Sequence, residues 1–158
     1  MNTEVETLSR QIRSLLGRVA EAVQGLSQAQ LNWRPPVVGA NSAYVIATHT
    51  LGNARAWVLG IACGQPMGRD RPAEFRASGP DAAALAAEAK NLSHEIESAL
   101  ASLSPADLER RLVPSPDLFG EGDPYEISVR EALLHVVEHA ALHLGQLQLT
   151  RDLALENA

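Results

Sequence analysis

The chain has 158 residues, 46% of them hydrophobic, and a formal net charge of −6, a composition that fits one folded domain over residues 1–158 and excludes wholesale disorder. The excess of acidic residues disfavours nucleic acid as a partner. Cys63 is the one cysteine, so an intrachain disulfide is excluded, and this suits a reducing cytoplasm. No apolar run is long enough to cross a membrane, and the charged stretch at residues 1–19 lacks the apolar core of a secretory signal, so we expect a cytoplasmic protein.

Four segments show apolar residues at intervals of three and four, the spacing that is typical of amphipathic helices. They cover about residues 3–25, 42–63, 81–103 and 128–153. Alanine and leucine, which favour helix, are abundant, whereas aromatic residues, which favour strands, make up only 4% of the chain. We therefore predict an all-α protein that is built as a four-helix bundle.

The linker between the second and third segments indicates how the helices are connected. Residues 64–80 form a connection of about 16 residues, whereas neighbouring antiparallel helices usually need only about 2–8. A linker of this length can cross the end or the side of a bundle. We therefore expect an up-down-down-up arrangement with a long crossover between helices two and three.

The connection at residues 112–127 is rich in proline and glycine and carries several acidic side chains. Two interpretations are open, since the loop either overhangs a site on the bundle or is a plain connector, and its composition favours the connector. Ser128 and Glu131 follow it with the spacing of a capping box. They predict the start of the last helix.

Three of the five histidines lie within nine residues in the last helical segment. His135, His139 and His143 are spaced i, i+4, i+8, so each step turns only about 40° and all three share one helix face. A pair one turn apart can converge on one metal ion, but His135 and His143 are about 12 Å apart along the axis. On a helical wheel His143 lies nearest the apolar arc, His139 next and His135 farthest, which favours the pair His139 and His143. The same spacing also fits a solvated stripe or a set of interface residues.

A third metal ligand should come from another helix, and His49 in the second segment is the candidate. Its neighbours at i+3, i+4 and i+7 are Gly52, Asn53 and Ala56, whose small size leaves space for a ligand or a facing helix. The fifth histidine, His94, lies between polar residues in the third segment. We interpret it as a surface residue.

Two stretches of the chain resemble the DinB/YfiT-like superfamily of bacterial four-helix proteins. They are LNWRPPVVGANSAYVIATHTLGNARAWVLG, with one histidine in a helix led by serine, and LLHVVEHAALHLGQ, which is similar to the family's last helix with its His-x-Gly-Gln ending. The resemblance covers nearly the whole chain and implies an up-down-down-up bundle, a homodimer and a metal triad of His49, His139 and His143. The family more often has arginine after the final histidine, whereas this chain has Leu144.

Three neutral imidazoles bind a borderline divalent cation such as zinc or nickel and leave positions open for water or substrate. Such an ion activates water, or it binds a thiolate; the resemblance implies a low-molecular-weight thiol such as mycothiol or bacillithiol as cosubstrate. Glu138 and Gln146 are candidates to hydrogen-bond the ligand imidazoles. Trp33 and Trp57 either line a pocket or pack in the core, and core packing is favoured. Cys63 is expected to be a packing residue.

Two functions fit these residues. In the first, the protein is a metal-dependent enzyme that uses water or a thiol for hydrolysis or group transfer on a small molecule, which the complete histidine set favours. In the second, it is a non-catalytic, dimeric, stress-related protein that binds a metal or a small ligand. The second function is favoured by the lack of an acidic residue at a spacing diagnostic of a general acid or base.

Overall fold

The computed structural model describes residues 3–158. Met1 and Asn2 lie outside the described residues, although they belong to the predicted domain and to the N-terminal stretch in which no secretory signal is predicted. The described chain is mostly helical, which confirms the helical fold class. The elements in chain order are α1 (Thr3–Ala22), α2 (Gln28–Asn32), α3 (Ala43–Ala54), the π-helix η1 (Arg55–Ala62), α4 (Arg71–Glu74), α5 (Ala83–Leu100), α6 (Pro105–Glu109), β1 (Arg111–Leu112), α7 (Pro116–Phe119), β2 (Ile127–Ser128) and α8 (Val129–Asn157).

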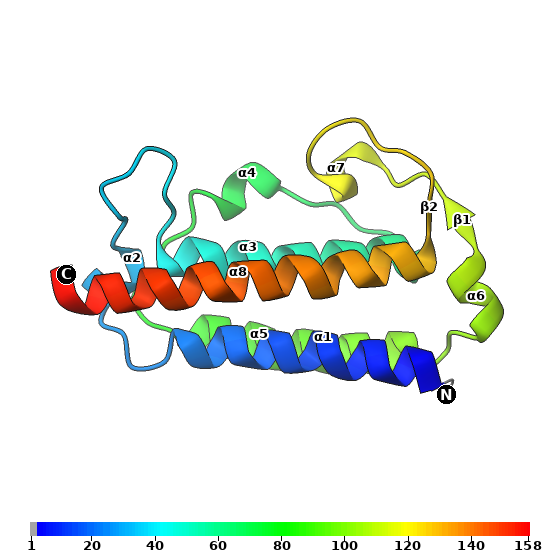
Figure 1. Cartoon of the computed structure of the whole chain (residues 1–158), viewed down its shortest axis with the longest axis horizontal. Helices are drawn as coiled ribbons and strands as arrows, with labels where there is room; N and C mark the ends of the chain where they lie inside the picture. The colour runs from blue at the N-terminus through cyan, green and yellow to red at the C-terminus, as the bar shows by residue number, and fades with distance from the viewer. Residues whose placement is uncertain (1–2) are drawn as a thin grey trace.

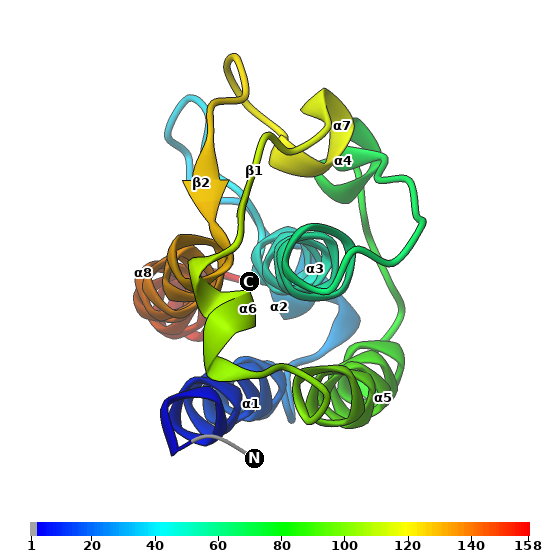
Figure 2. The ribbon, with the colours of Figure 1, turned by 90° about the vertical axis from the view of Figure 1, so that its right-hand side faces the viewer.

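The long helices lie side by side in two layers (Figures 1 and 2). One layer holds α1 and α5, and the other holds α3, its extension η1, and α8. The most extensive packing is between α1 and α8, between α1 and α5, and between α3 and α8. Apolar side chains from all four long helices meet in the centre, among them the fully buried Ile12, Leu16, Leu92 and Leu133.

Local sequence explains where these helices begin. The Ser42 hydroxyl accepts a hydrogen bond from the Val45 amide and caps α3. The predicted capping box is present at the start of α8, where the Ser128 hydroxyl accepts from the Glu131 amide and the Glu131 carboxylate accepts from the Ser128 amide. Each cap satisfies amides that have no partner within the helix.

The predicted second helix is continuous but changes its type along its length. After Ala54 the chain passes from the α-helix α3 into the π-helix η1 without a break. At its end the Cys63 amide donates to the Val58 carbonyl at 2.9 Å, five residues back. The wider turn begins between Asn53 and Trp57, and π-helical turns are frequent at functional sites.

Both long connections lie on the outer side of α3 and η1. The linker at residues 64–80 carries α4 along α3, and the connection at residues 112–127 carries α7 against η1 (Figure 2). The second connection is closed at its base by the short strands β1 and β2, which the all-α prediction did not include. They pair antiparallel, with Arg111 opposite Ser128 and Leu112 opposite Ile127.

No helix in the described part of the chain is long and apolar enough to cross a bilayer.

Candidate metal centre

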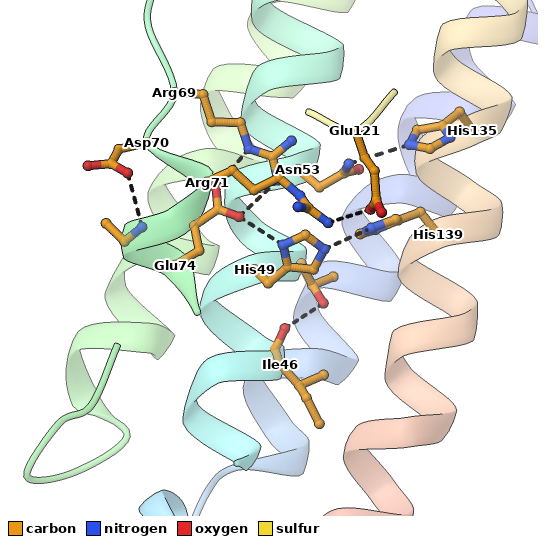
Figure 3. A network of polar contacts seen from close by, with 12 residues as sticks. Ile46, His49, Asn53, Arg69, Asp70, Arg71, Glu74, Glu121, His135 and His139 are labelled. Carbon is orange, nitrogen blue, oxygen red and sulfur yellow. Dashed lines mark hydrogen bonds and ion pairs between the residues drawn. The ribbon is translucent and has the colours of Figure 1, made fainter. Parts of the chain in front are cut away.

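Three of the five histidines meet between α3 and α8. His49 lies on α3, and His139 and His143 lie one turn apart on α8. One ring nitrogen from each lies within 4.8 Å of the others, and Nε2 of His49 is 3.1 Å from Nε2 of His139 (Figure 3). His49 is only 5% exposed. The structure thus brings together the three residues that the sequence indicates as metal ligands.

The spacing of these nitrogens fits a small divalent cation. In a tetrahedral site with zinc–nitrogen distances of about 2.0–2.1 Å, two ligand nitrogens lie about 3.3 Å apart. The 3.1 Å between Nε2 of His49 and Nε2 of His139 is close to this value. Two imidazole lone pairs at such a distance repel each other unless a proton or a cation lies between them. The donor set of three imidazoles suits zinc or nickel.

Glu74 of α4 holds the other ring nitrogen of His49. Its Oε2 lies 2.8 Å from His49 Nδ1, and Arg69 donates to both of its carboxylate oxygens at 2.7 and 2.9 Å. Burial acts to raise the pKa of Glu74, but hydrogen bonds from His49 and Arg69 together hold that pKa below its ordinary value. An ionised carboxylate only accepts, so His49 Nδ1 carries the proton and Nε2 directs its lone pair at the cluster.

Sequence reasoning missed Glu74 because it lies 25 residues after His49, in the long linker. One local signal was available at Gly52, which precedes Asn53 on α3. A Cβ atom at Gly52 would lie 2.4 Å from Glu74 Oε1. From the sequence, the small size of Gly52 is interpreted as space for a ligand or a facing helix. In the structure, this space is occupied by the carboxylate of Glu74.

Gln146 is one of the two residues that the sequence indicates as hydrogen-bond partners of the ligand imidazoles, and it contacts the outer nitrogen of His143. Its Oε1 accepts from His143 Nδ1 at 2.6 Å, which leaves His143 Nε2 for the cluster. The other candidate, Glu138, is exposed and forms no hydrogen bond with a histidine among residues 3–158. The Nδ1 of His139 is buried and has no partner in that part of the chain.

The surroundings keep the α8 imidazoles neutral. Burial, reinforced by the neighbouring His143 and His49, lowers the pKa of His139 to about 2. Burial also lowers the pKa of His143, although the hydrogen bond to Gln146 opposes this shift. At pH 7 both rings are therefore unprotonated, which is the state that metal binding requires.

A cavity of about 230 Å³ opens beside the cluster, and both His49 and His139 contribute to its lining. Arg71 and Glu121 lie at one side of it and form an ion pair at 2.8 Å. Phe119 supplies an aromatic wall from the end of α7, 5.4 Å from Trp57 between ring centroids. A small molecule in this cavity therefore reaches the histidine cluster directly.

His135, which the helical wheel places farthest from the apolar arc, also lies in this cavity. It stacks on Trp57 with ring centroids 3.7 Å apart, and its Nε2 lies 3.4 Å from Asn53 Nδ2. It is not one of the three clustered histidines, and burial lowers its pKa. The wheel was misleading because α8 packs against α3 and η1 as well as α1, so its buried face is wider than its apolar arc.

The connection at residues 112–127 contributes to the cavity, although its composition favoured the interpretation as a plain connector. Phe119, Glu121 and Tyr125 from this segment line the cavity. Trp57 combines both roles considered for it, since it is only 5% exposed and lines the cavity. Trp33 is half-buried at the end of α2 and is not part of the lining.

The remaining histidine and the cysteine lie outside the site. His94 is exposed on α5, as the sequence predicts. Cys63 follows η1 and packs partly buried against the core. Burial raises the pKa of its thiol to about 11, so the thiol is protonated at pH 7, and Cys63 is not among the clustered residues.

Comparisons with known proteins place the chain in a family. The family model of the DinB superfamily matches residues 11–147. Among solved structures, a DinB-like protein from Bacillus subtilis has a TM-score of 0.62 at 20% identity, covering 96% of this chain and 92% of that one. A conserved protein from Enterococcus faecalis has a TM-score of 0.70 at 16% identity, covering 99% of each chain. No curated protein matches the chain. With a family match over most of its length and the same fold in both solved structures, the chain belongs to the DinB superfamily.

Proposed function

We propose that this protein binds one divalent metal ion, zinc or nickel, through His49, His139 and His143, and acts with it on a small molecule in the adjoining cavity. The observation that carries the proposal is the pair of Nε2 atoms of His49 and His139, which face each other at 3.1 Å. The outer nitrogens of His49 and His143 are held by Glu74 and Gln146, so each ring is oriented toward the cluster.

The reaction that fits this site is hydrolysis or group transfer. His49, His139 and His143 would hold the ion through three ligands, and the ion would supply open positions for the activation of water or of the thiolate of a low-molecular-weight thiol. His49 is held rigidly because Glu74 is itself clamped by Arg69. The Arg71–Glu121 pair and the aromatic side chain of Phe119 line the cavity beside the cluster.

A non-catalytic metal- or ligand-binding protein is the alternative, and one observation favours it. Both carboxylates nearest the cluster already have partners, since Glu74 accepts from His49 and Arg69, and Glu121 pairs with Arg71. Among residues 3–158, the lining of the cavity thus holds no unpaired carboxylate that would act as a general base. Under this alternative the site binds a metal or a small ligand without turnover.

We also propose that residues 1–158 form a single domain with the up-down-down-up topology. Figure 1 supports this, because α3 and α5 both run away from the end where the chain terminates, whereas α1 and α8 run toward it. The proposed assembly is a homodimer, and the proposed location is the cytoplasm. The homodimer is supported by three apolar side chains on α8, Leu142, Leu149 and Leu153, which are 62%, 63% and 39% exposed.

The metal content of protein purified without a histidine tag tests the site. Elemental analysis should find about one zinc or nickel ion per chain in the parent and none in His49→Ala and His143→Ala. The exposed His94→Ala variant is the matched control and should keep the metal. Equal trace amounts in all four proteins would exclude the proposed site.

Activity assays then separate the enzyme from the alternative. The metal-loaded protein is incubated with small electrophiles or esters, with and without a low-molecular-weight thiol, and products are identified by mass spectrometry. Turnover that disappears in His143→Ala supports the enzyme. Stoichiometric metal without turnover in either condition supports the non-catalytic protein.

A further inference from the structure

Besides Nδ1 of the proposed ligand His139, two buried polar atoms of residues that line the cavity have no partner within the described part of the protein. Asn53 is 4% exposed and Trp57 is 5% exposed, and both line the cavity next to the histidine cluster. Asn53 Oδ1, a hydrogen-bond acceptor, and Trp57 Nε1, a donor, are both unpaired among residues 3–158. Most buried polar groups in proteins are hydrogen-bonded, so these two atoms, together with His139 Nδ1, call for a partner that the described protein does not supply.

The orientation of Asn53 identifies which of its atoms is available. Its Nδ2 lies 3.4 Å from His135 Nε2, so the oxygen is the atom that is left without a partner (Figure 3). His135 is held in place in turn by its stacking on Trp57 at 3.7 Å. The two unpaired atoms therefore belong to a mutually supported group of three side chains.

The two residues project from the same side of one helical stretch. Trp57 follows Asn53 by four residues, the spacing that places side chains on one face. The change from α3 to η1 begins between them, at Arg55. A single small group in the cavity can therefore reach both side chains.

The charges around these atoms favour a neutral group. Both arginines of the lining already have partners, because Arg69 is paired with Glu74 and Arg71 with Glu121. An anion would also be repelled by the oxygen of Asn53. A carboxamide meets both requirements, since its N–H donates to an acceptor and its carbonyl accepts from an N–H.

We propose that Asn53 and Trp57 form a subsite for a carboxamide group of the substrate, with the N–H on Asn53 Oδ1 and the carbonyl on Trp57 Nε1. This inference rests on the function proposed above, because it names the substrate class of the same site. Asn53 lies one helical turn after His49, about 6 Å along the axis. The substrate is thus a small molecule whose carboxamide is several bonds from the group that reaches the histidines.

Nuclear magnetic resonance of the two tryptophan indoles tests the subsite with a simple probe. Uniformly ¹⁵N-labelled protein is titrated with N-methylacetamide and, separately, with methyl acetate, which keeps the carbonyl but lacks the N–H. The indole signal of Trp57 should shift saturably with the amide, while the signal of Trp33, outside the cavity, stays in place. The amide should bind about threefold to tenfold more tightly than the ester, as expected for one hydrogen bond.

Variants locate this preference. In Asn53→Leu, which keeps the side-chain volume but removes the acceptor, amide and ester should bind equally. Ser9 of α1 has a hydroxyl that is also buried and unpaired within the described chain but does not line the cavity. In Ser9→Ala, the preference for the amide should be unchanged. The inference is overturned if the parent protein shows no preference, if Asn53→Leu retains it, or if the Trp57 signal does not respond. The first and third outcomes need only the parent protein, so the test does not depend on the folding of a variant.

Running the titration on chelator-treated protein and on zinc-loaded protein separates this inference from the proposed function. Amide binding in both samples, together with trace metal in the untagged protein, would support the subsite and contradict the metal-dependent function. Stoichiometric metal with no amide preference would support the metal site and contradict the subsite.

Discussion

The two helix layers bury different chemistry. In the layer of α1 and α5, the buried side chains are apolar with the single exception of Ser9. In the layer of α3 and α8, α3 buries His49, Thr50 and Asn53, and the linker adds the nearly buried Glu74. Polar groups in an interior cost stability unless they are paired. The first layer therefore contributes almost only apolar packing, whereas the second adds to its apolar packing the polar groups that a binding site needs.

The largest expected effect tests the first layer. Leu16 of α1 is fully buried, so Leu16→Ala leaves a cavity and should lower the free energy of unfolding by about 2–5 kcal/mol. The folded fraction of the variant should still bind one metal ion per chain. Urea denaturation measures the first quantity and elemental analysis the second. Loss of metal from the folded variant would show that the two layers are not separable.

A smaller effect, on metal affinity, tests the second layer. Glu74→Gln removes the charge that orients His49, so metal affinity should fall about 10- to 100-fold. The matched control is Glu97→Gln, which breaks a half-exposed ion pair with Arg13 in the other layer. That change should leave metal affinity unaltered and alter the free energy of unfolding by no more than about 1 kcal/mol. Competition with a chromophoric chelator measures both affinities, and equal losses would remove Glu74 from the proposed site.

The stability of metal-free protein should depend on pH through the second layer. Burial first, and then its histidine neighbours, lowers the pKa of His139 to about 2, whereas an unfolded histidine titrates near 6.5. Below pH 6.5, His139 binds a proton in the unfolded chain but stays unprotonated in the folded chain. The free energy of unfolding therefore falls as the pH falls. One such group contributes a slope of up to about 1.4 kcal/mol per pH unit.

Urea denaturation in a chelator between pH 7.5 and pH 5 measures this slope. It should be reduced in His139→Gln and unchanged in His94→Gln, which alters an exposed side chain on α5. A slope that is the same in the parent and in both variants would contradict the neutral state of His139.

Two glycines give the finest comparison. A Cβ at Gly17, on α1, meets nothing within 4 Å, so Gly17→Ala should stabilise the protein by about 0.5–1 kcal/mol. A Cβ at Gly52, on α3, would lie 2.4 Å from Glu74 Oε1, a carboxylate that Arg69 holds in place. Gly52→Ala should therefore weaken metal binding, though less than Glu74→Gln does. Thermal unfolding and the chelator competition check the pair, and identical behaviour of the two variants would argue against a tight fit at Gly52.

The helical nature of the fold was predictable because its signals are local. Apolar spacing marks the long helices, and the capping box of Ser128 and Glu131 marks the start of α8. The π-helical turn of η1 and the short β1–β2 pair were not predictable in the same way. Each lies against segments that are distant in sequence, since α7 packs on η1 and β1 pairs with β2 across a connection of 14 residues (113–126).

For the site, the sequence by itself indicated the three histidines that the structure brings together. His139 and His143 are related by one turn of a single helix, and His49 was indicated by its small neighbours and by the family resemblance. Tertiary structure alone decided what surrounds them: Glu74 behind His49, and His135 and Tyr125 in the lining of the cavity. The physical reason is range, since helical spacing relates residues a turn apart, whereas a carboxylate 25 residues away meets its histidine only once the linker has folded back along α3.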